Sequence, residues 1–253
     1  MSLPPILYHY FSRPLPYLST WNLQQHIHQL QLHLRAASAH PDVLLLLHHR
    51  PTYTSGRRQS DSEIDQDRTR LQNLGADFVS ATRGGQLTYH GPGQLVGYPL
   101  IDLSRYSPTM GARDYVCRIQ KLMENHLRDS HAIFHAPSEH TGIGSIGVQV
   151  RHRLTSHGFA INITREPLPW FDEIVACGLD DVKAGSIESK LHTPVNLNRE
   201  VSGIIHQFGK SFGRNMVEMD TTKLGQIGEA IMALEKEAEA AGPWCTEPRP
   251  HTP

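Results

Sequence analysis

The chain has 253 residues, a formal net charge of -1 at pH 7 and a hydrophobic content of 38%, which suits one domain, or at most two, with enough apolar residues for a core. The near-zero charge argues against binding of nucleic acid or a membrane through bulk charge, and no apolar run approaches the length of a membrane span. Three cysteines form no C-x-x-C pair and no Cys/His zinc spacing, so we expect a reducing compartment and no metal site. The 17 histidines are scattered, and several of them (His26, His28 and His33) fall on a predicted helix that also has many glutamines. We interpret most of the histidines as surface residues.

The first third of the chain is predicted to mix helices and short strands. Thr20 is placed to cap a helix that continues to Leu34, because apolar residues recur there at helical spacing. The unbroken apolar run at 43–47 predicts a buried strand. The range 62–74 predicts a second helix, which Gly75 is placed to end.

The middle and last thirds continue with short mixed elements. Strands are predicted at 77–81 and 95–103, on both sides of a glycine-rich stretch, and the clearest amphipathic helix at 111–130. Further strands are predicted at 132–135, 146–150 and 159–163, and further helices at 201–212 and 224–234. Because strands and helices do not alternate regularly, the pattern favours an α+β fold over a doubly wound sheet.

The chain is predicted to form one main domain with a C-terminal extension. We expect the main domain at 5–220, a C-terminal helix at 221–241 and a disordered tail at 242–253, since the tail has four prolines and no periodicity. The first 41 residues contain no Asp or Glu, as is typical of organelle transit peptides. Arg13 and Arg35 are the only fixed cations there, however, and the second half of this segment is predicted to be helical.

The stretch from Arg83 to Gln94, RGGQLTYHGPGQ, contains four glycines in twelve residues. Glycine has no Cβ, so backbone N–H groups in such a loop can approach a ligand closely. A loop between two strands is also a common way to present a binding surface. The alternative interpretation is a turn-rich connection without chemistry.

Two other residues are candidates for chemistry. Cys177 lies between an apolar run and Gly178, and a thiolate at this turn could accept an acyl group from a thioester without ATP. A lone cysteine is otherwise usually a small buried hydrophobe. His157 could orient or deprotonate a thiol or an amine, or it could be a structural histidine bonded to the backbone.

Three ordered segments of the chain resemble the octanoyl (lipoyl) transferases that start protein lipoylation. They are RGGQLTYHGPGQLVGYPLIDL from Arg83, SIGV followed by TSHGFAIN at 145–162, and WFDEIVACGL from Trp170. A chance match of three ordered motifs is improbable, and the resemblance covers about residues 5–215. It implies the α+β fold shared by biotin and lipoate protein ligase catalytic domains, in which a mixed sheet is packed with helices.

The resemblance implies an acyltransferase that takes an octanoyl group from acyl carrier protein onto Cys177. The group would then pass to the ε-amine of a lysine on a lipoyl domain, with Cys177 and His157 as the catalytic residues. The residues implied to line the acyl and pantetheine site are Arg83, Gly84, Gly85, Gln86, Leu87, Thr88, Tyr89, His90, Ser145, Ile146, Gly147, Gly158, Phe159 and Ala160. No metal, nucleotide or other cofactor is required.

The implied partners are octanoyl-acyl carrier protein, the lipoyl domains of 2-oxoacid dehydrogenase complexes and the glycine cleavage H protein, with no nucleic acid and no membrane. The implied location is mitochondrial in a eukaryote and otherwise cytoplasmic. Two alternatives remain. An ATP-dependent lipoate ligase would need a lysine near the scissile phosphate, and none lies by the glycine-rich stretch. An impaired variant would only bind the carrier protein.

The chain departs from the family at Gly142, which stands where the family carries a lysine, with about one hairpin strand missing. A neighbouring ammonium lowers the pKa of a thiol and raises its thiolate fraction. We therefore expect a weak or inactive catalyst with an exposed sheet edge, unless Lys183, Lys190 or His157 replaces the lysine.

Overall fold

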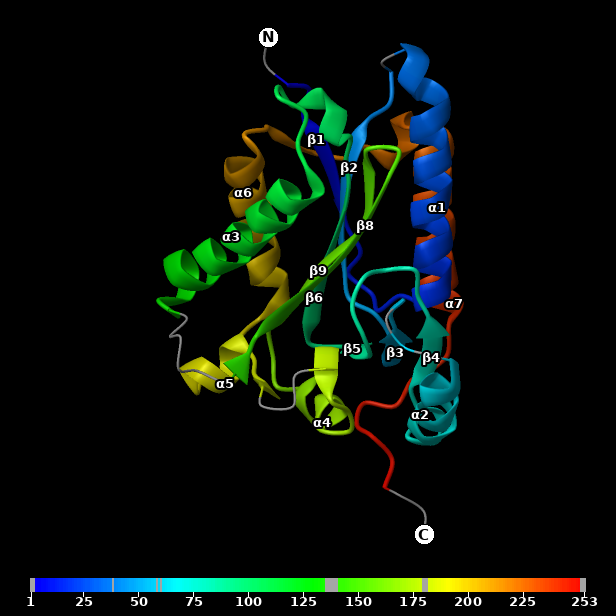
Figure 1. Cartoon of the computed structure of the whole chain (residues 1–253), viewed down its shortest axis with the longest axis vertical. Coiled ribbons are helices and arrows are strands. Elements are labelled where there is room, and N and C mark those ends of the chain that lie inside the picture. The colour runs from blue at the N-terminus through cyan, green and yellow to red at the C-terminus, as the bar shows by residue number, and fades with distance from the viewer. Residues whose placement is uncertain are drawn as a thin grey trace.

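The computed structural model describes residues 3–37, 39–57, 59, 61–134, 141–178 and 182–250, and its centre is a mixed six-stranded sheet (Figure 1). In spatial order the strands are β11 (Met216–Glu218), β1 (Ile6–Tyr10), β2 (Asp42–Leu47), β6 (Gln94–Leu100), β9 (Leu154–Asn162) and β8 (Gly144–Arg151). β1 pairs in parallel with β11 and β2, whereas the β2–β6, β6–β9 and β9–β8 pairs are antiparallel. With its helices, this mixed sheet confirms the α+β fold expected from the sequence.

Two smaller sheets accompany the main one in the described part of the chain. β4 (Asp77–Ser80), β3 (Thr52–Ser55) and β5 (Thr88–His90) form the first, and β10 (Lys183–Ala184) with β7 (Thr141–Gly142) forms the second. β5 falls inside the glycine-rich stretch, because its residues pair antiparallel with β3. Among the described strands, β8 ends the main sheet on its side, where a free edge was expected.

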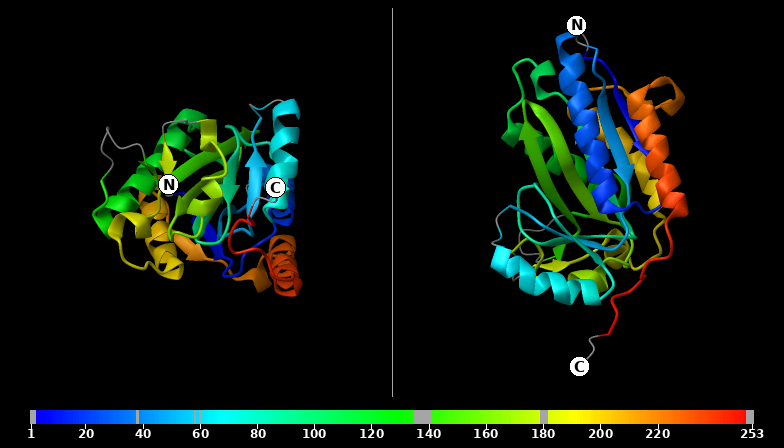
Figure 2. Two further views of the ribbon diagram at one scale, coloured as in Figure 1. Left: turned by 90° about the horizontal axis from the view of Figure 1, so that it is seen from below. Right: turned by 90° about the vertical axis from the view of Figure 1, so that its right-hand side faces the viewer.

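Helices cover both faces of the main sheet, with α3 and α6 on one side and α1 and α7 on the other (Figure 1, Figure 2). The helices are α1 (Tyr17–Leu34), α2 (Asp61–Asn73), α3 (Ala112–His131), α4 (Leu168–Phe171), α5 (Ile187–Leu191), α6 (Leu197–Phe212) and α7 (Gln226–Ala240). Short 3-10 helices are η1 (Arg35–Ala37), η2 (Leu103–Arg105), η3 (Ala176–Gly178) and η4 (Thr221–Lys223).

This layering explains the unbroken apolar run of β2. Leu44 and Leu46 belong to the core beneath α3 and α6, whereas Val43, Leu45 and Leu47 belong to the core beneath α1 and α7. Successive side chains of a strand point to opposite faces, so a strand covered on both sides carries apolar residues throughout.

The predicted start of α1 and the strand predicted at 132–135 differ from the structure. α1 begins at Tyr17 rather than at Thr20, because the Thr20 hydroxyl donates a hydrogen bond back to the Pro16 carbonyl (2.7 Å) inside the first turn. Residues 132–134 form no strand, because Ala132 adopts the left-handed conformation (φ 52°) that ends α3. His135, the last residue of that predicted strand, lies outside the described residues.

The C-terminal segment packs on the domain through α7, whose Ile227 and Ile231 are buried in the same core as α1. Residues 242–250 form no helix or strand, and the Arg249 N–H donates to the Leu74 carbonyl (2.9 Å). The disorder expected at 242–253 stays a prediction, as does the division at residue 220. No helix within the described residues combines the length and apolar character needed to cross a bilayer.

Candidate active site

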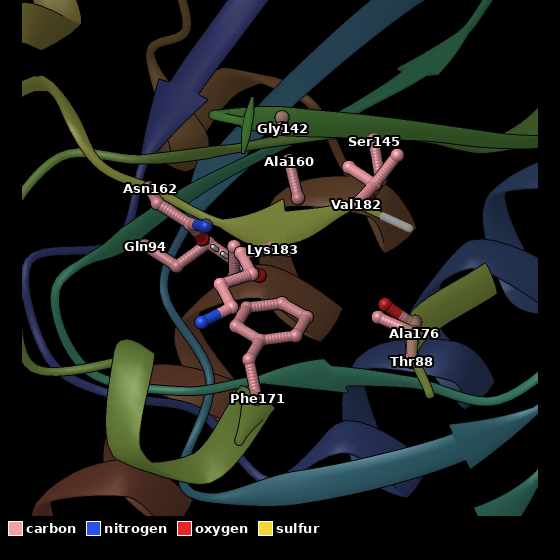
Figure 3. A pocket seen from close by; sticks show the side chains of 12 residues that line it. Thr88, Gln94, Gly142, Ser145, Ala160, Asn162, Phe171, Ala176, Val182 and Lys183 are labelled. Atoms are coloured by element: carbon pink, nitrogen blue, oxygen red, sulfur yellow. Dashed lines mark hydrogen bonds between the residues drawn. The ribbon is translucent and has the colours of Figure 1, made fainter. Parts of the chain in front are cut away.

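A cavity that is open to solvent lies where β5, β8 and β9 approach α4 and η3 (Figure 3). We call it the cysteine-side cavity, because its lining residue Ala176 directly precedes Cys177. Its remaining lining residues are Thr88, Gln94, Gly142, Gly144, Ser145, Ala160, Asn162, Phe171, Val182, Lys183 and Ala184. Gln94 and Asn162 had not been expected to line the binding site, whereas Lys183 had been considered as a replacement for the missing lysine.

A second cavity adjoins the first, since Thr88, Ser145 and Ala160 line both. We call it the arginine-side cavity after its lining residue Arg83. Most residues that were expected to bind substrate line it, namely Arg83, Gly84, Gly85, Thr88, His90, Ser145, Ile146, Gly147, Gly158, Phe159 and Ala160. The structure thus brings the glycine-rich stretch together with the two motifs on β8 and β9.

Arg83 ties the start of the glycine-rich stretch to β3. Its Nη2 donates to the Thr54 carbonyl (2.5 Å) and to the Thr54 hydroxyl (2.7 Å), and Nη1 donates to the Gly84 carbonyl (3.1 Å). The side chain is buried, and hydrogen bonds to a buried charged donor are stronger than those between neutral groups. Arg83 therefore fixes the wall of the arginine-side cavity as well as giving it positive charge.

The alternation of β5 separates lining residues from core residues. Thr88 and His90 face the cavities, whereas Leu87 and Tyr89 are buried in the core of the small sheet. Tyr89 stacks on Trp170 with ring centroids 5.3 Å apart. Side chains of a strand alternate between its faces, so Leu87 and Tyr89 support the wall instead of contacting the cavity.

A chain of amide hydrogen bonds crosses the floor of the cysteine-side cavity. The Gln94 side-chain amide donates to Asn162 Oδ1 (2.9 Å), and the Asn162 amide donates to the Gly185 carbonyl (2.9 Å). His90 Nδ1 lies 2.6 Å from Gln94 Oε1, so the ring donates there as the neutral Nδ1–H tautomer. Burial lowers the pKa of His90 to about 4, which keeps the imidazole neutral near pH 7.

His157 lies on β9 and lines the arginine-side cavity. Its ring stacks on Trp21 (centroids 4.4 Å apart), and its backbone N–H donates to Gln24 Oε1 (2.8 Å). Burial, and after it the charge of Arg83, lowers the pKa of His157 to about 3. Its φ of 56° is unusual for a non-glycine residue, and Nδ1 has no hydrogen-bond partner among the described residues. The structure therefore places a neutral imidazole in the arginine-side cavity. Ala176, which precedes Cys177, lines the cysteine-side cavity, so His157 and the turn of Cys177 border different cavities.

The turn that carries Cys177 contacts the glycine-rich stretch. The backbone of Cys177 is the middle of η3, between Ala176 and Gly178. Gly178 has a φ of +67°, and a Cβ there would lie 1.7 Å from Gln86 Oε1. Glycine suits this left-handed backbone, and a larger residue here would require the Gln86 side chain to move. Gln86 therefore packs against the residue that follows Cys177 and lines neither cavity.

Lys183 lies beside the position of Gly142. In the parallel β10–β7 pair, Lys183 is opposite Thr141 and Ala184 is opposite Gly142. Lys183 lines the cysteine-side cavity together with Ala176, and Figure 3 shows its amine end beside the Phe171 ring. Lys190, on α5, lines neither cavity.

Comparison with known proteins gives one consistent relationship. The chain matches the family model of the lipoyl protein ligase A/B catalytic domain over residues 16–209. An octanoyltransferase from Caldicellulosiruptor saccharolyticus is 34% identical over 206 residues, which cover 78% of this chain and 85% of that protein. The mitochondrial octanoyl-acyl-carrier-protein:protein N-octanoyltransferase of Danio rerio is 35% identical over 196 residues, which cover 75% of this chain and 84% of that protein. The chain belongs to the octanoyltransferase family.

Solved structures share the fold of this octanoyltransferase family member. Lipoate-protein ligase A bound with ATP matches with a TM-score of 0.61 at 14% identity and covers 94% of both chains. A bipartite lipoate protein ligase from Thermoplasma acidophilum, described with its E2 lipoyl domain, has a TM-score of 0.58 at 13% identity and covers 94% of this chain and 92% of that chain. At such low identities the likeness shows the fold alone, and it confirms the ligase-type architecture expected from the three motifs.

Proposed function

We propose that this octanoyltransferase family member moves an octanoyl group from acyl carrier protein to the ε-amine of a lysine on a lipoyl domain, the first step of protein lipoylation. The observation that supports this most is the pair of adjoining cavities. They offer an extended thioester substrate one continuous wall, from the turn of Cys177 to Arg83.

The first step is a thioester exchange at Cys177. The Cys177 thiolate attacks the thioester carbonyl of octanoyl-acyl carrier protein, a new C–S bond forms, and the C–S bond to pantetheine breaks. The pantetheine sulfur leaves with the electron pair of the broken bond and takes up a proton. Because one thioester replaces another of similar energy, no ATP is consumed.

The second step forms an amide. The neutral ε-amine of the acceptor lysine attacks the Cys177 thioester, the C–N bond forms, and the C–S bond breaks. The cysteine sulfur keeps the electron pair of that bond, and the nitrogen loses one proton. The resulting amide is more stable than the thioester, so this step drives the transfer.

The two cavities suit different parts of the donor. In the arginine-side cavity Val96, Ile146 and Phe159 supply apolar wall, the imidazoles of His90 and His157 are neutral, and Arg83 is held by hydrogen bonds. We assign this cavity to the octanoyl chain. In the other cavity, the side-chain amides of Gln94 and Asn162 can hydrogen-bond pantetheine amides.

Lys183 is our candidate for the ammonium that the family places at Gly142. It lies on the strand paired with Gly142 and lines the cavity beside η3, whereas Lys190 lines neither cavity. His157 is a poor replacement, because its low pKa leaves it uncharged. An ammonium near Cys177 would raise the thiolate fraction and could protonate the leaving pantetheine sulfur.

The role of Cys177 is tested by incubation with octanoyl-acyl carrier protein, without ATP, followed by intact-protein mass spectrometry. The wild-type chain should gain one hydroxylamine-sensitive octanoyl group and transfer it to a lipoyl domain. Cys177→Ala should do neither, whereas Cys117→Ala, which removes an exposed cysteine on α3, should do both. A mass gain that persists in Cys177→Ala, or transfer that requires ATP, would contradict the proposal.

The role of Lys183 is tested by the pH dependence of Cys177 alkylation, followed on the peptide that contains Cys177. Lys183→Gln should move the onset of fast alkylation upward by about one pH unit, a tenfold loss of thiolate at fixed pH. Lys190→Gln is the matched control and should leave the profile unchanged. If Lys183→Gln and Lys190→Gln show the same pH profile of alkylation, Lys183 does not lower the pKa of the Cys177 thiol, and its proposed role is wrong.

The proposed acceptors are lipoyl domains of 2-oxoacid dehydrogenase complexes and the glycine cleavage H protein. The proposed location, if the chain is eukaryotic, is the mitochondrion. The similarity to the Danio rerio enzyme, whose name includes its mitochondrial location, supports this location. The acid-poor first 41 residues do not, because they contain β1 and α1 of the folded domain.

A further inference from the structure

Two histidines and one glutamate converge at the contact between α3 and α6. His126 Nε2 lies 2.8 Å from Glu200 Oε2, and His131 Nε2 lies 2.7 Å from the same oxygen. The three ligand atoms lie within 4.8 Å of one another. α3 and α6 pack side by side (Figure 1), and none of the three residues lines either active-site cavity.

The cluster has the chemistry of a site for a first-row divalent cation. Imidazole nitrogen with one carboxylate oxygen is a common donor set for Zn²⁺, which binds nitrogen at about 2.0–2.1 Å. Tetrahedral angles at those bond lengths place neighbouring ligand atoms about 3.4 Å apart. The three ligand atoms are already near this spacing, so side-chain adjustments of about 1 Å would seat a cation between them.

The surroundings fit the proton arrangement that a bound cation needs. A ligating Nε2 must carry no proton, so with a cation bound the ring proton of each histidine lies on Nδ1. Ser130 Oγ lies 3.5 Å from His126 Nδ1 and can accept that proton in a hydrogen bond. Such a partner fixes the orientation of a ligating histidine. Gly203 leaves room for the ring, since a Cβ there would lie 2.8 Å from His126 Cε1.

The burial of the cluster favours ligation and still allows entry. The side chain of His126 is 1% exposed, that of Glu200 9% and that of His131 12%. Because His131 is the most exposed of the three side chains, it marks the side from which a cation can enter.

We propose that His126, His131 and Glu200 bind one divalent cation of the zinc type, with water completing a tetrahedral site. The cation joins the last turn of α3 to the first turn of α6. It takes no part in acyl transfer, and its role is to hold these two helix ends together. This site is independent of the function proposed for the cavities.

The experiment measures metal binding on the full chain after treatment with a chelator. Co²⁺ should bind at one equivalent and give the intense visible d–d bands of tetrahedral coordination, without the thiolate charge-transfer band that a cysteine site would add. At a free Zn²⁺ concentration about 100 times Kd, the thermal midpoint should rise by about 5–10 °C.

Matched variants locate the site. His131→Ala, at the end of α3, should lose the bound equivalent and the thermal shift, and Ser130→Ala should weaken binding by about tenfold. His206→Ala removes an exposed histidine from α6 and should change neither. If the wild-type chain takes up no more Co²⁺ or Zn²⁺ than His131→Ala, or shows no tetrahedral bands, the cluster is hydrogen-bonded only and the proposal is overturned.

Discussion

Histidines gather around a charge in two regions of this molecule, and the sign of that charge differs. In the arginine-side cavity, His90 and His157 lie near the Arg83 guanidinium, which together with burial lowers the pKa of both rings. Between α3 and α6, His126 and His131 both bond to the Glu200 carboxylate. Beside the positive charge of Arg83, we propose that the histidine rings stay neutral and form part of the wall for an apolar substrate. Beside the negative charge of Glu200, we propose that the histidine rings bind a metal cation.

Removing the central cation of the first region should have the largest effect on stability. Arg83→Met leaves the Thr54 carbonyl and hydroxyl without their buried donors, and we expect the free energy of unfolding to fall by about 2–4 kcal/mol. The pKa of His157 should rise, because the Arg83 charge lowers it, but burial is the larger cause and should keep the ring neutral at pH 7. Urea unfolding and NMR titration of the histidine rings measure both effects. An imidazolium at pH 7 in this variant would contradict the comparison.

Removing the central anion of the second region should cost less. Both histidines bond to the same Glu200 oxygen, so the one carbonyl oxygen of Glu200→Gln can still accept both N–H groups. The bonds lose their charged acceptor, however, and we expect a loss of about 1–2 kcal/mol in the free energy of unfolding without metal. The folded pKa of Glu200 lies below its ordinary value of 4.5, so its contribution is present above pH 4.5 and is lost as the pH falls through the folded pKa. Acid unfolding should show this component in the wild-type chain and lack it in Glu200→Gln.

The last prediction concerns the slope of stability against pH, taken per pH unit. The pKa of His157 is about 3 in the folded state against 6.5 ordinarily, so the unfolded chain binds a proton first. Stability from this group is present above pH 6.5 and is lost as the pH falls from 6.5 towards 3. His157→Gln should flatten the slope in that window by about 1.4 kcal/mol per pH unit. His206→Gln, at an exposed site on α6, should not, and equal slopes would show that His157 is charged when folded.

Most helices and strands were predicted where a single sequence pattern, such as an apolar run or an amphipathic face, is strong. β2 was visible as an apolar run because both of its faces are covered, and α3 because one face is apolar. The start of α1 was misplaced because a threonine hydroxyl can bond backward as well as cap. β5 is too short to be seen among glycines, and its pairing with β3 depends on residues far away in the sequence.

The site was predicted in part, because the family motifs contain most of the residues that line the arginine-side cavity. Motifs indicate which stretches meet, but not which face of a strand each residue occupies. Leu87 and Tyr89 were grouped with Thr88 and His90, yet they pack in the core of the small sheet and line neither cavity. The place of Lys183 depends on the β7–β10 pairing. Burial of histidines leaves no local signal either: His28 is buried, contrary to the prediction. The His126 cluster was missed because its carboxylate comes from another helix.

Because β5 consists of three residues, one short backbone segment determines both the shape of the substrate wall and the packing of the core around Trp170. Thr88 and His90 form cavity wall, and Tyr89 between them stacks on Trp170, at the start of the segment that leads to Cys177. A substitution that tightens the packing around Trp170 must shift the same backbone that shapes the substrate wall. Selection for a sturdier core and selection for a different acyl chain therefore cannot proceed separately here, and we expect variants with altered chain-length preference to include changes at the core face of β5.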